Sequence, residues 1–392
     1  MVLAPTPPAN DLVTPDRLNE KQDSFPLEVY QCSDCGHAQL LDIVDPERLF
    51  RHYLYVSGTS PVFVRHLRDY ARWSIEKYKV SAGSLIVEIA SNDGTLLKYF
   101  QEKGMSILGI DPAENLAKAA TKAGIETLPE FFSVELAKKI KHERGAAKVV
   151  AANNVFAHAD DLAGFADGVR ELLADDGVFI LEVSYLVDVF EKTLFDTIYH
   201  EHVSYHTVGP LRGFFPRHGL ELIDVLRVDS QGGSIRCVAQ LAGGPWPQCD
   251  SVEELIDLEK RLGLNDTSAM KSYARQVDGL KKDLRELLGE LESQGKTVAG
   301  FGAPAKATTL MHYFGLGADD LDFIVDENPL KQGLFTPGTL VPIVAPDALS
   351  LKKPDYTLVL AWNFADNIVE RYKGYSDAGG KFIVPIPKVV VR

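Results

Sequence analysis

The sequence predicts an α/β protein with two units in which strands and helices alternate. Short, apolar, β-branched runs are separated by helical patterns between residues 84 and 184, and again between residues 297 and 362. Such alternation is typical of parallel sheets covered by helices. The chain has 392 residues, 45% hydrophobic and 24% charged, which predicts a globular protein of several domains.

Charge and hydropathy argue against two classes of partner. The chain carries 41 Lys and Arg against 55 Asp and Glu, a net charge of −14, which opposes the phosphate neutralisation on which nonspecific nucleic-acid binding depends. Its apolar runs are shorter than the roughly 20 residues of a membrane helix, and its first residues lack the pattern of a secretory signal. We therefore expect a soluble, cytoplasmic protein without nucleic-acid or membrane partners.

A small N-terminal domain is predicted over residues 1–65, where proline and turn residues are frequent. Cys32 and Cys35 flank a tight turn between two strand-like runs, which is the pattern of half a zinc knuckle. Cys237 and Cys249 are isolated in the sequence, so we expect reduced thiols and no disulfide framework.

The first α/β unit is predicted over residues 66–205 and follows a helical pattern at 62–78. Strands are expected at 84–90, 106–111, 148–154 and 178–184, and helices after Gly94, at 115–124 and at 165–177. The carboxyl ends of such strands share one edge of the sheet, where ligands bind.

Residues 206–392 are predicted to form a further region that ends in a Rossmann-like unit from about residue 294. Its expected elements are a strand pair at 220–229 and 234–242, one polar helix at 251–293, and strands at the start of TVAGFG and at 321–328, 339–344 and 356–362.

Acidic and polar residues mark a nucleoside site at the edge of the first unit. Glu88 closes one strand, a polar turn leads into a helix, and Asp111 closes the next strand about 20 residues further on, where a carboxylate can accept ribose hydroxyls. The expected cofactor-binding residues are Glu88, Ser91, Asn92, Asp93, Gly94, Asp111, Pro112, Asn153 and Asn154.

The turn favours S-adenosylmethionine over a dinucleotide. It lacks the complete G-x-G-x-x-G pattern that admits a pyrophosphate, and a sulfonium cofactor without phosphate is suited to the oxygens of Glu88 and Asp93. The alternative is a buried strand and a polar turn without a ligand. Phe131 and Phe132 either border the adenine or pack in the core.

A second cluster of residues is suited to proton removal. Tyr199, Glu201 and His202 follow the last strand of the unit and His158 follows the strand at 148–154, so both groups emerge at one sheet edge. Carbon methylation begins with loss of a proton beside a carbonyl, for which an imidazole is a suitable base. A carboxylate such as Glu201 can orient the ring, and a tyrosine or second histidine can donate to the enolate oxygen.

Other interpretations of these residues stay open. His200, His202 and His206 either form a metal site, for which their spacing matches no closed four-ligand pattern, or are structural. An oxygen or nitrogen methyltransferase, a nicotinamide-dependent oxidoreductase using the C-terminal unit, and a noncatalytic scaffold are the alternative functions.

Two further segments are candidate phosphate sites. Ala303 and Lys306 lie in FGAPAKATTL, where a turn opens a helix whose N-terminus can receive a phosphate; the alternative is close helix–strand packing without a ligand. Gly232, Ser234 and Arg236 in QGGSIR form the second candidate, against a β-bulge or turn.

Several motifs together resemble those of the sugar C-methyltransferases of deoxysugar pathways. They are PLEVYQCSDCGHAQL, YLYVSGTS, VEIASNDG, NNVFAH, DTIYHEHVSYH, GGSIR, and FGAPAKATTL with VDENPLKQG, and they cover nearly the whole chain. The resemblance implies a zinc-binding N-terminal domain, a class I methyltransferase domain with S-adenosylmethionine, and a C-terminal Rossmann-like domain. It also implies a nucleotide-diphosphate-linked 4-keto-6-deoxy sugar, bound between the domains, and S-adenosylhomocysteine as a product.

The resemblance assigns roles to individual residues. His202 falls on the family's base, and Tyr199 and Glu201 on its companions. His158 and Tyr53 fall on positions that line the sugar pocket.

The zinc site departs from the family's pattern. The family uses two C-x-x-C pairs, whereas only Cys32 and Cys35 are present and the sequence begins just after the expected place of the first pair. Two thiolates cannot complete tetrahedral zinc, so zinc binding is doubtful. We expect a site that is empty, completed by another ligand such as His37, or lost through a misassigned start.

Overall fold

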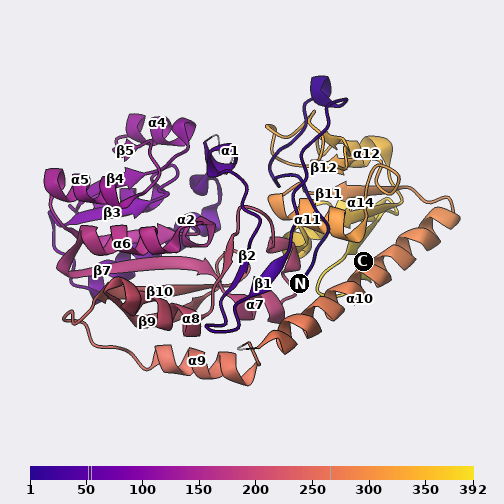
Figure 1. Ribbon diagram of the computed structural model, residues 1–392. Coiled ribbons are helices and arrows are strands. Elements are labelled where there is room, and N and C mark those ends of the chain that lie inside the picture. Colours follow the sequence, from indigo (N-terminus) through magenta and orange to yellow (C-terminus); the bar gives the residue numbers. More distant parts are fainter. Residues whose placement is uncertain (52, 54, 265) are drawn as a thin grey trace.

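Three sheets organise the computed structural model, which describes residues 1–51, 53, 55–264 and 266–392 (Figure 1). A seven-stranded and a six-stranded sheet, each with helices packed against it, form two α/β units, and a small three-stranded sheet lies at the N-terminal segment between them. The predicted α/β fold class is confirmed.

The seven-stranded sheet has the order β5-β4-β3-β6-β7-β10-β9. Its strands are β3 (Leu85–Ile89), β4 (Ser106–Ile110), β5 (Thr127–Leu128), β6 (Ala147–Asn153), β7 (Leu173–Ser184), β9 (Leu220–Val228) and β10 (Ser234–Leu241). The first five are parallel, and β10 runs antiparallel to both of its neighbours. The chain leaves β3 toward β4 and later returns to β6 on the other side, which opens a crevice at the carboxyl ends of β3 and β6.

Helices cover both faces of this sheet. Ile86 faces the apolar core shared with α2 (Pro61–Lys77) and α3 (Thr95–Gln101), whereas Val87 faces the core shared with other helices. Those are α5 (Val134–Arg144), α6 (Leu162–Leu172) and α8 (Val208–Phe214), and α4 (Glu114–Lys122) follows β4. Burial on both faces explains why the strands read as continuous apolar runs.

The six-stranded sheet has the order β13-β12-β11-β14-β15-β16. Its strands are β11 (Val298–Phe301), β12 (Ile324–Val325), β13 (Ile343–Val344), β14 (Tyr356–Val359), β15 (Lys381–Val384) and the antiparallel β16 (Val390–Val391), with helices α11 (Ala305–Phe314), α12 (Ala348–Lys352), α13 (Ala365–Arg371) and α14 (Lys373–Asp377). Here the order reverses between β11 and β14, so this unit has its own crevice at the ends of these strands.

The N-terminal segment connects the two units. Strands β1 (Val29–Gln31) and β2 (Ala38–Leu40) form the predicted hairpin around the two cysteines, and β2 pairs with β8 (Ser204–Tyr205). On the other side, Val13 bridges to Phe335 of the C-terminal unit. The remaining elements are α1 (Pro46–Phe50), α7 (Leu186–Glu191) and short 3-10 helices η1 (Pro15–Arg17), η2 (Ser57–Thr59), η3 (Phe156–His158), η4 (Phe195–Thr197), η5 (Phe215–His218) and η6 (Trp362–Phe364).

The prediction of one helix over 251–293 was wrong. Two helices occur instead, α9 (Ser251–Arg261) and α10 (Thr267–Ser293). Gly263 has a φ of +69°, a left-handed conformation that ends a helix, and the Asp266 side chain caps α10 by accepting from the Ser268 amide. The helix expected at 165–177 ends at Leu172, because ADDG belongs to β7. Among the described residues, no helix is both long and apolar enough to span a bilayer.

Candidate active site

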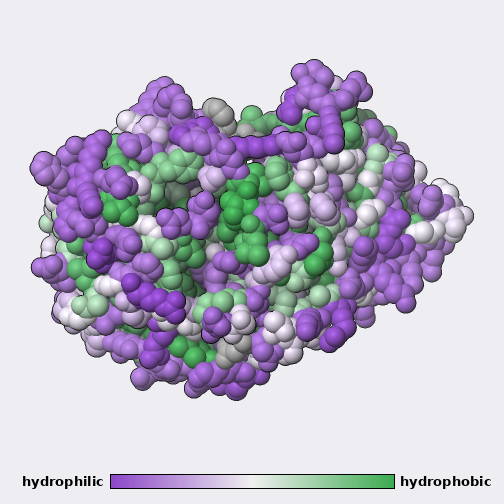
Figure 2. Space-filling view, in the orientation of Figure 1, coloured by the Kyte–Doolittle hydropathy of each residue, from purple (hydrophilic) through white to green (hydrophobic). Residues whose placement is uncertain are grey.

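The carboxyl ends of both parallel sheets open into one cavity of about 1050 Å³. Residues after β3 and β6 line one side of it, and Pro304, Lys306 and Asn363, which follow β11 and β14, line the other. In Figure 2, apolar side chains gather in the middle of the molecular face beside a hollow, with hydrophilic residues around them. The volume is slightly above the usual range for ligand pockets, about 300–1000 Å³.

The cavity wall at β3 and β6 contains buried polar atoms without a hydrogen-bond partner among the described residues. They are Glu88 Oε2, Ser91 Oγ and both amide atoms of Asn153. Burial raises the pKa of Glu88 well above its usual range. Because an unsatisfied buried polar group is costly, these atoms fit a polar ligand, and a cationic one would favour the ionised form of Glu88.

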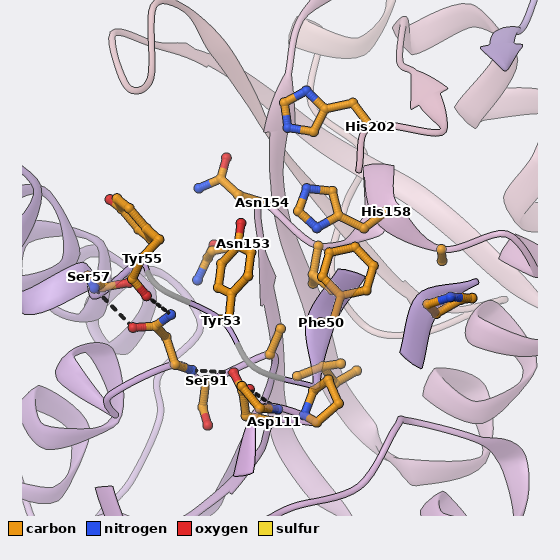
Figure 3. Close-up of a pocket in the computed structure, with 18 of the residues that line it drawn as sticks. Phe50, Tyr53, Tyr55, Ser57, Ser91, Asp111, Asn153, Asn154, His158 and His202 are labelled. Carbon is orange, nitrogen blue, oxygen red and sulfur yellow. Dashed lines mark hydrogen bonds between the residues drawn. The ribbon is translucent and has the colours of Figure 1, made fainter. Parts of the chain in front are cut away.

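Asp111 is held at the same wall by two backbone amides. Its Oδ2 accepts from the Asn92 amide at 2.7 Å and its Oδ1 from the Ala113 amide at 2.9 Å, as Figure 3 shows. Its neighbour Pro112 also lines the cavity. The carboxylate oxygens keep free lone pairs, which fits acceptance from ribose hydroxyls.

The turn between β3 and α3 is built by residues with left-handed backbone. Asn92 has a φ of +53° and Gly94 one of +77°, and a Cβ at Gly94 would lie 2.6 Å from Ile125 Cγ2, so glycine is required there. Asp93 is not one of the residues that line the cavity, and its carboxylate accepts from the Gly58 and Thr95 amides. Asp93 and Gly94 thus shape the turn, whereas Ser91 and Asn92 line the cavity.

Three further groups complete this end of the cavity. Asn92 Oδ1 accepts from the Ser57 amide at 2.9 Å, which ties the segment before α2 to the turn (Figure 3). Asn154, with a φ of +54°, lines the cavity beside Asn153. Phe131 and Phe132 both line it as well, and Phe132 also packs on Phe165. The polar groups at this end of the cavity do not include a glycine-rich phosphate-binding loop, and they fit S-adenosylmethionine.

His202 lies in the same cavity in a defined tautomer. Its Nδ1 lies 2.7 Å from the Thr197 carbonyl oxygen, and because a carbonyl only accepts, Nδ1 carries the proton and Nε2 is left as the acceptor. Burial lowers the pKa of His202 to about 4. The ring is therefore neutral at physiological pH, with Nε2 able to accept a proton.

Aromatic rings stack in a column beside His202. His158 stacks on His202 with ring centroids 5.1 Å apart and on Phe50 at 5.4 Å, and Figure 3 shows these three rings in succession. Tyr199 contacts the His202 ring with centroids 4.2 Å apart. Burial, together with the neighbouring His202, lowers the pKa of His158 well below its usual range, which keeps this ring neutral too.

Glu201 has a different partner from the one expected. Its side chain is buried and accepts from the Tyr53 hydroxyl at 3.0 Å and from the Asn10 amide at 2.6 Å, while the Thr197 carbonyl orients the His202 ring. Glu201 therefore positions Tyr53, which lines the cavity. Leu54 of the YLYVSGTS motif lies outside the described residues.

The three clustered histidines do not converge on one point. His200 Nε2 bonds the Pro26 carbonyl oxygen at 3.0 Å, and the buried His206 packs on the Phe156 ring. No group of three His, Cys, Asp or Glu side chains in the described part of the chain has the arrangement of a metal site. The placement of His200 and His206 favours the structural interpretation.

The N-terminal hairpin places its cysteines at the surface. Cys32 and Cys35 are exposed free thiols in a turn closed by the Gly36 amide, which donates to the Cys32 carbonyl. His37, the expected additional ligand, lies within hydrogen-bonding distance of Ser204 Oγ, with Nε2 3.2 Å away. The residues present do not form a complete zinc site.

Lys306 lines the cavity at the first turn of α11, and its side chain is 15% exposed. Ala303 does not line it: its amide donates to Asp326 Oδ2 at 2.7 Å and its carbonyl accepts from Lys331. Asp326 directly follows β12, the place of a ribose-binding acid in a dinucleotide fold. Its oxygens accept from two backbone amides, as those of Asp111 do. The case against a nicotinamide cofactor in this unit is therefore the incomplete glycine pattern of FGAPAK.

The second candidate phosphate segment is only partly at the cavity. Gly232 lines it. Ser234 is buried and donates to the Ser230 carbonyl, and Arg236 is buried in an ion pair with Glu182 at 2.8 Å. We therefore leave Ser234 and Arg236 out of the proposed substrate site, because their donors already have internal partners.

Two contributors were missed in the sequence. Phe50 stacks on His158, and Thr197 orients His202 through its main-chain carbonyl. A backbone carbonyl carries no residue-type signal, and Phe50 lies in a segment whose contact with η3 depends on tertiary structure.

Comparisons with known proteins identify relatives of this chain. Family models match over most of the chain: the "Putative zinc binding domain" at residues 1–50, the "Methyltransferase domain" at 64–225 and the "C-methyltransferase C-terminal domain" at 229–387. The C-methyltransferase NovU of Streptomyces niveus is 37% identical over 383 residues, which cover 98% of this chain and 91% of that protein.

Solved structures were also matched. An S-adenosylmethionine-dependent methyltransferase of Anabaena variabilis is 17% identical over 48% of this chain and 88% of that one, with a TM-score of 0.38. The magnesium protoporphyrin IX methyltransferase of Synechocystis, with bound S-adenosylmethionine, is 13% identical over 45% of this chain and 78% of that one, with a TM-score of 0.34.

The family matches decide between the functions left open by the sequence. A match to C-methyltransferases over nearly the full length sets aside the oxidoreductase, the scaffold and the oxygen- or nitrogen-methylating enzyme. The chain belongs to the family of three-domain, S-adenosylmethionine-dependent C-methyltransferases.

Proposed function

We propose that this protein methylates a carbon atom of a nucleotide-diphosphate-linked 4-keto-6-deoxy sugar, with His202 as the base. The observation that carries the proposal is that Nε2 of His202 is left as an acceptor in a cavity that also contains Glu88 and Asp111. Carbon methylation requires a base next to the methyl donor, because the C–H bond beside the carbonyl must lose its proton.

The methyltransferase unit would hold the cofactor, which supplies an electrophilic methyl group when bound. Asp111 would accept from its ribose hydroxyls, as would be expected of the acid that ends the second strand. The unpartnered atoms of Glu88, Ser91 and Asn153 would bind its polar end. The Ser57–Asn92 contact would close the segment before α2 over this end.

The substrate carbonyl would lie against the aromatic column. His202 Nε2 would remove the proton from the adjacent carbon, and the hydroxyl of Tyr199 or the ring of His158 would donate to the oxygen on which negative charge develops. Burial raises the pKa of Tyr199 well above its usual range, so its hydroxyl remains a donor. Tyr53, fixed by Glu201, would line the sugar.

The sugar nucleotide would be held from the C-terminal side. Lys306 offers a cation in the cavity wall at the N-terminus of α11, and both the charge and the helix end favour phosphate oxygens. Gly232 contributes to the opposite wall without a side chain.

The experiment is a His202→Ala variant, compared with His218→Ala as a matched control, because His218 lies outside the cavity and is paired with Asp167. Both would be incubated with labelled S-adenosylmethionine and a panel of nucleoside-diphosphate 4-keto-6-deoxy sugars. For His202→Ala we expect S-adenosylhomocysteine affinity to be retained and exchange of the sugar C–H proton with deuterium oxide to fall by about 10²–10⁴-fold. Exchange and methylation at the wild-type rate would refute the role of His202.

A further inference from the structure

The 3-10 helix η4 (Phe195–Thr197) precedes Tyr199 and His202 and is anchored by the C-terminal unit. The Phe195 ring stacks on Phe314 of α11 with centroids 5.1 Å apart. Thr309, on the same helix, is buried and its Oγ1 donates to the Ile198 carbonyl at 2.7 Å. The residues on both sides of Asp196 and Thr197 are thus fixed to α11.

Asp196 is a further anchor of η4. Its side chain is fully buried, and its Oδ2 accepts from the Trp362 indole N–H of η6 at 2.6 Å. Lys306 Nζ lies 3.8 Å from the same oxygen and 4.1 Å from the centroid of the Trp362 ring. A carboxylate without solvent depends on such partners, so the C-terminal unit determines where Asp196 sits.

Thr197 lies between these anchored residues, and it contacts His202 through its backbone and not through its side chain. Its carbonyl accepts from Nδ1 of His202 at 2.7 Å, while its own hydroxyl is turned back to the Leu194 carbonyl. If η4 shifted, this carbonyl would leave Nδ1, and the ring would be free to adopt the tautomer in which Nε2 carries the proton and cannot act as a base.

We propose that Asp196, Trp362 and Thr309 are positioning residues, through which the C-terminal unit holds the Thr197 carbonyl against Nδ1 and fixes the tautomer of His202. The inference rests on the proposed role of His202 as the base, but the tautomer of the His202 ring can be measured without substrate. None of the three groups needs to contact the reacting atoms.

The first test compares Trp362→Phe with Trp246→Phe by ¹⁵N-detected NMR of the histidine rings, with the His202 signals assigned by their loss in His202→Ala. Each variant removes one indole N–H, because Trp246 Nε1 donates to the Asp176 carbonyl at 3.0 Å, away from the cavity. We expect Trp246→Phe to retain the wild-type pattern with Nδ1 protonated, and Trp362→Phe to show a mixture of tautomers. An unchanged pattern in folded Trp362→Phe would overturn the proposal.

The second test uses variants of Thr309 and does not depend on the folding of Trp362→Phe. Thr309→Val removes the hydroxyl that bonds the Ile198 carbonyl and preserves the shape of the side chain, whereas Thr309→Ser keeps the hydroxyl. We expect a mixed tautomer and a kcat lowered by about 10-fold or more in Thr309→Val, because a small displacement of the base is costly, with the KM for S-adenosylmethionine unchanged and with recovery in Thr309→Ser. Equal loss in both variants, or none in either, would count against positioning.

Failure of this inference can be told apart from failure of the proposed function. If His202→Ala retained proton exchange, His202 would not be the base, whatever its tautomer. If His202→Ala lost exchange while Trp362→Phe and Thr309→Val kept both the tautomer and kcat, the base would stand and the anchoring by the C-terminal unit would be rejected.

Discussion

At the scale of single residues, burial sets the chemistry of His202. Its pKa is lowered from 6.5 to about 4 by desolvation, so the ring stays neutral to a lower pH than an ordinary histidine. A depressed folded-state pKa means that the neutral, proton-accepting form is lost only as the pH falls through the lower value.

The pH profile of the reaction should show this shift. We expect kcat/KM to remain nearly flat as the pH falls from about 7.5 to about 5.5, since the free enzyme's base determines the acidic limb. The measurement is kcat/KM for the sugar nucleotide at saturating S-adenosylmethionine, with circular dichroism at each pH to verify folding. An acidic limb with its midpoint near 6.5 would mean that the base is a solvated imidazole.

Single residues also show what the sequence could predict. Glu88 and Asp111 were found because the acids that end neighbouring parallel strands occur at a characteristic spacing, and the structure places both at the cavity. Arg236 was predicted to bind a phosphate because of its charge, but its guanidinium is already paired with the buried carboxylate of Glu182. Whether a charged side chain is free depends on partners distant in sequence, and no local pattern reports them.

At the scale of elements, the buried strands of the first unit were predicted more accurately than the helices. A strand buried on both faces is an apolar run with clear limits, as in β3 and β6. Residues 251–293 were predicted to form one helix, because the helical spacing of apolar residues continues through the break. The break itself occurs at Gly263, whose backbone has a left-handed conformation. Helix α5, whose polar residues weaken its periodicity, was not anticipated.

Helix α9 is joined to α8 by one buried carboxylate. Glu259 accepts from the Tyr185 hydroxyl at 2.9 Å and from the backbone amides of Val208 and Gly209 at 2.6 and 3.0 Å. These amides belong to the first turn of α8, which has no other side-chain cap, so Glu259 serves as a cap supplied by another helix.

Removal of this cap should destabilise the protein. We expect Glu259→Ala to lower the free energy of unfolding by about 1.5–3 kcal/mol, because buried donors lose a charged acceptor. Urea unfolding followed by circular dichroism would measure it. Glu254→Ala, an exposed change on the same helix, should stay within about 0.5 kcal/mol of wild type, and equal stability of the two variants would contradict the assignment of Glu259 as a cap.

At the scale of the whole molecule, the site results from the docking of two α/β units. Each sheet has a crevice where its strand order reverses, and the structure turns both crevices toward one cavity. The alternating pattern predicted each unit and its ligand edge. It could not predict that Lys306 and His202 share a cavity, because that depends on how the N-terminal segment and η4 join the units.

Because the two α/β units line different sides of the cavity, a substitution in one unit can weaken the binding of one ligand and leave the binding of the other unchanged. Lys306→Met removes the cavity cation of the C-terminal unit and preserves much of the apolar stem. Because Lys306 is also a partner of the buried Asp196, we expect kcat to fall as well, so the readout for phosphate binding is KM. If Lys306 binds a phosphate, the loss of a charge-assisted hydrogen bond of about 1.5–3 kcal/mol should raise the KM for the sugar nucleotide by roughly 10–100-fold. The affinity for S-adenosylhomocysteine, measured by calorimetry, should be unchanged, because Glu88 and Asp111 lie on the other unit. Lys352→Met, an exposed change in the C-terminal unit, should alter neither value. A normal KM for the sugar nucleotide in Lys306→Met would mean that the phosphates bind elsewhere. Weakened binding of S-adenosylhomocysteine in this variant would mean that the two halves of the cavity are not independent.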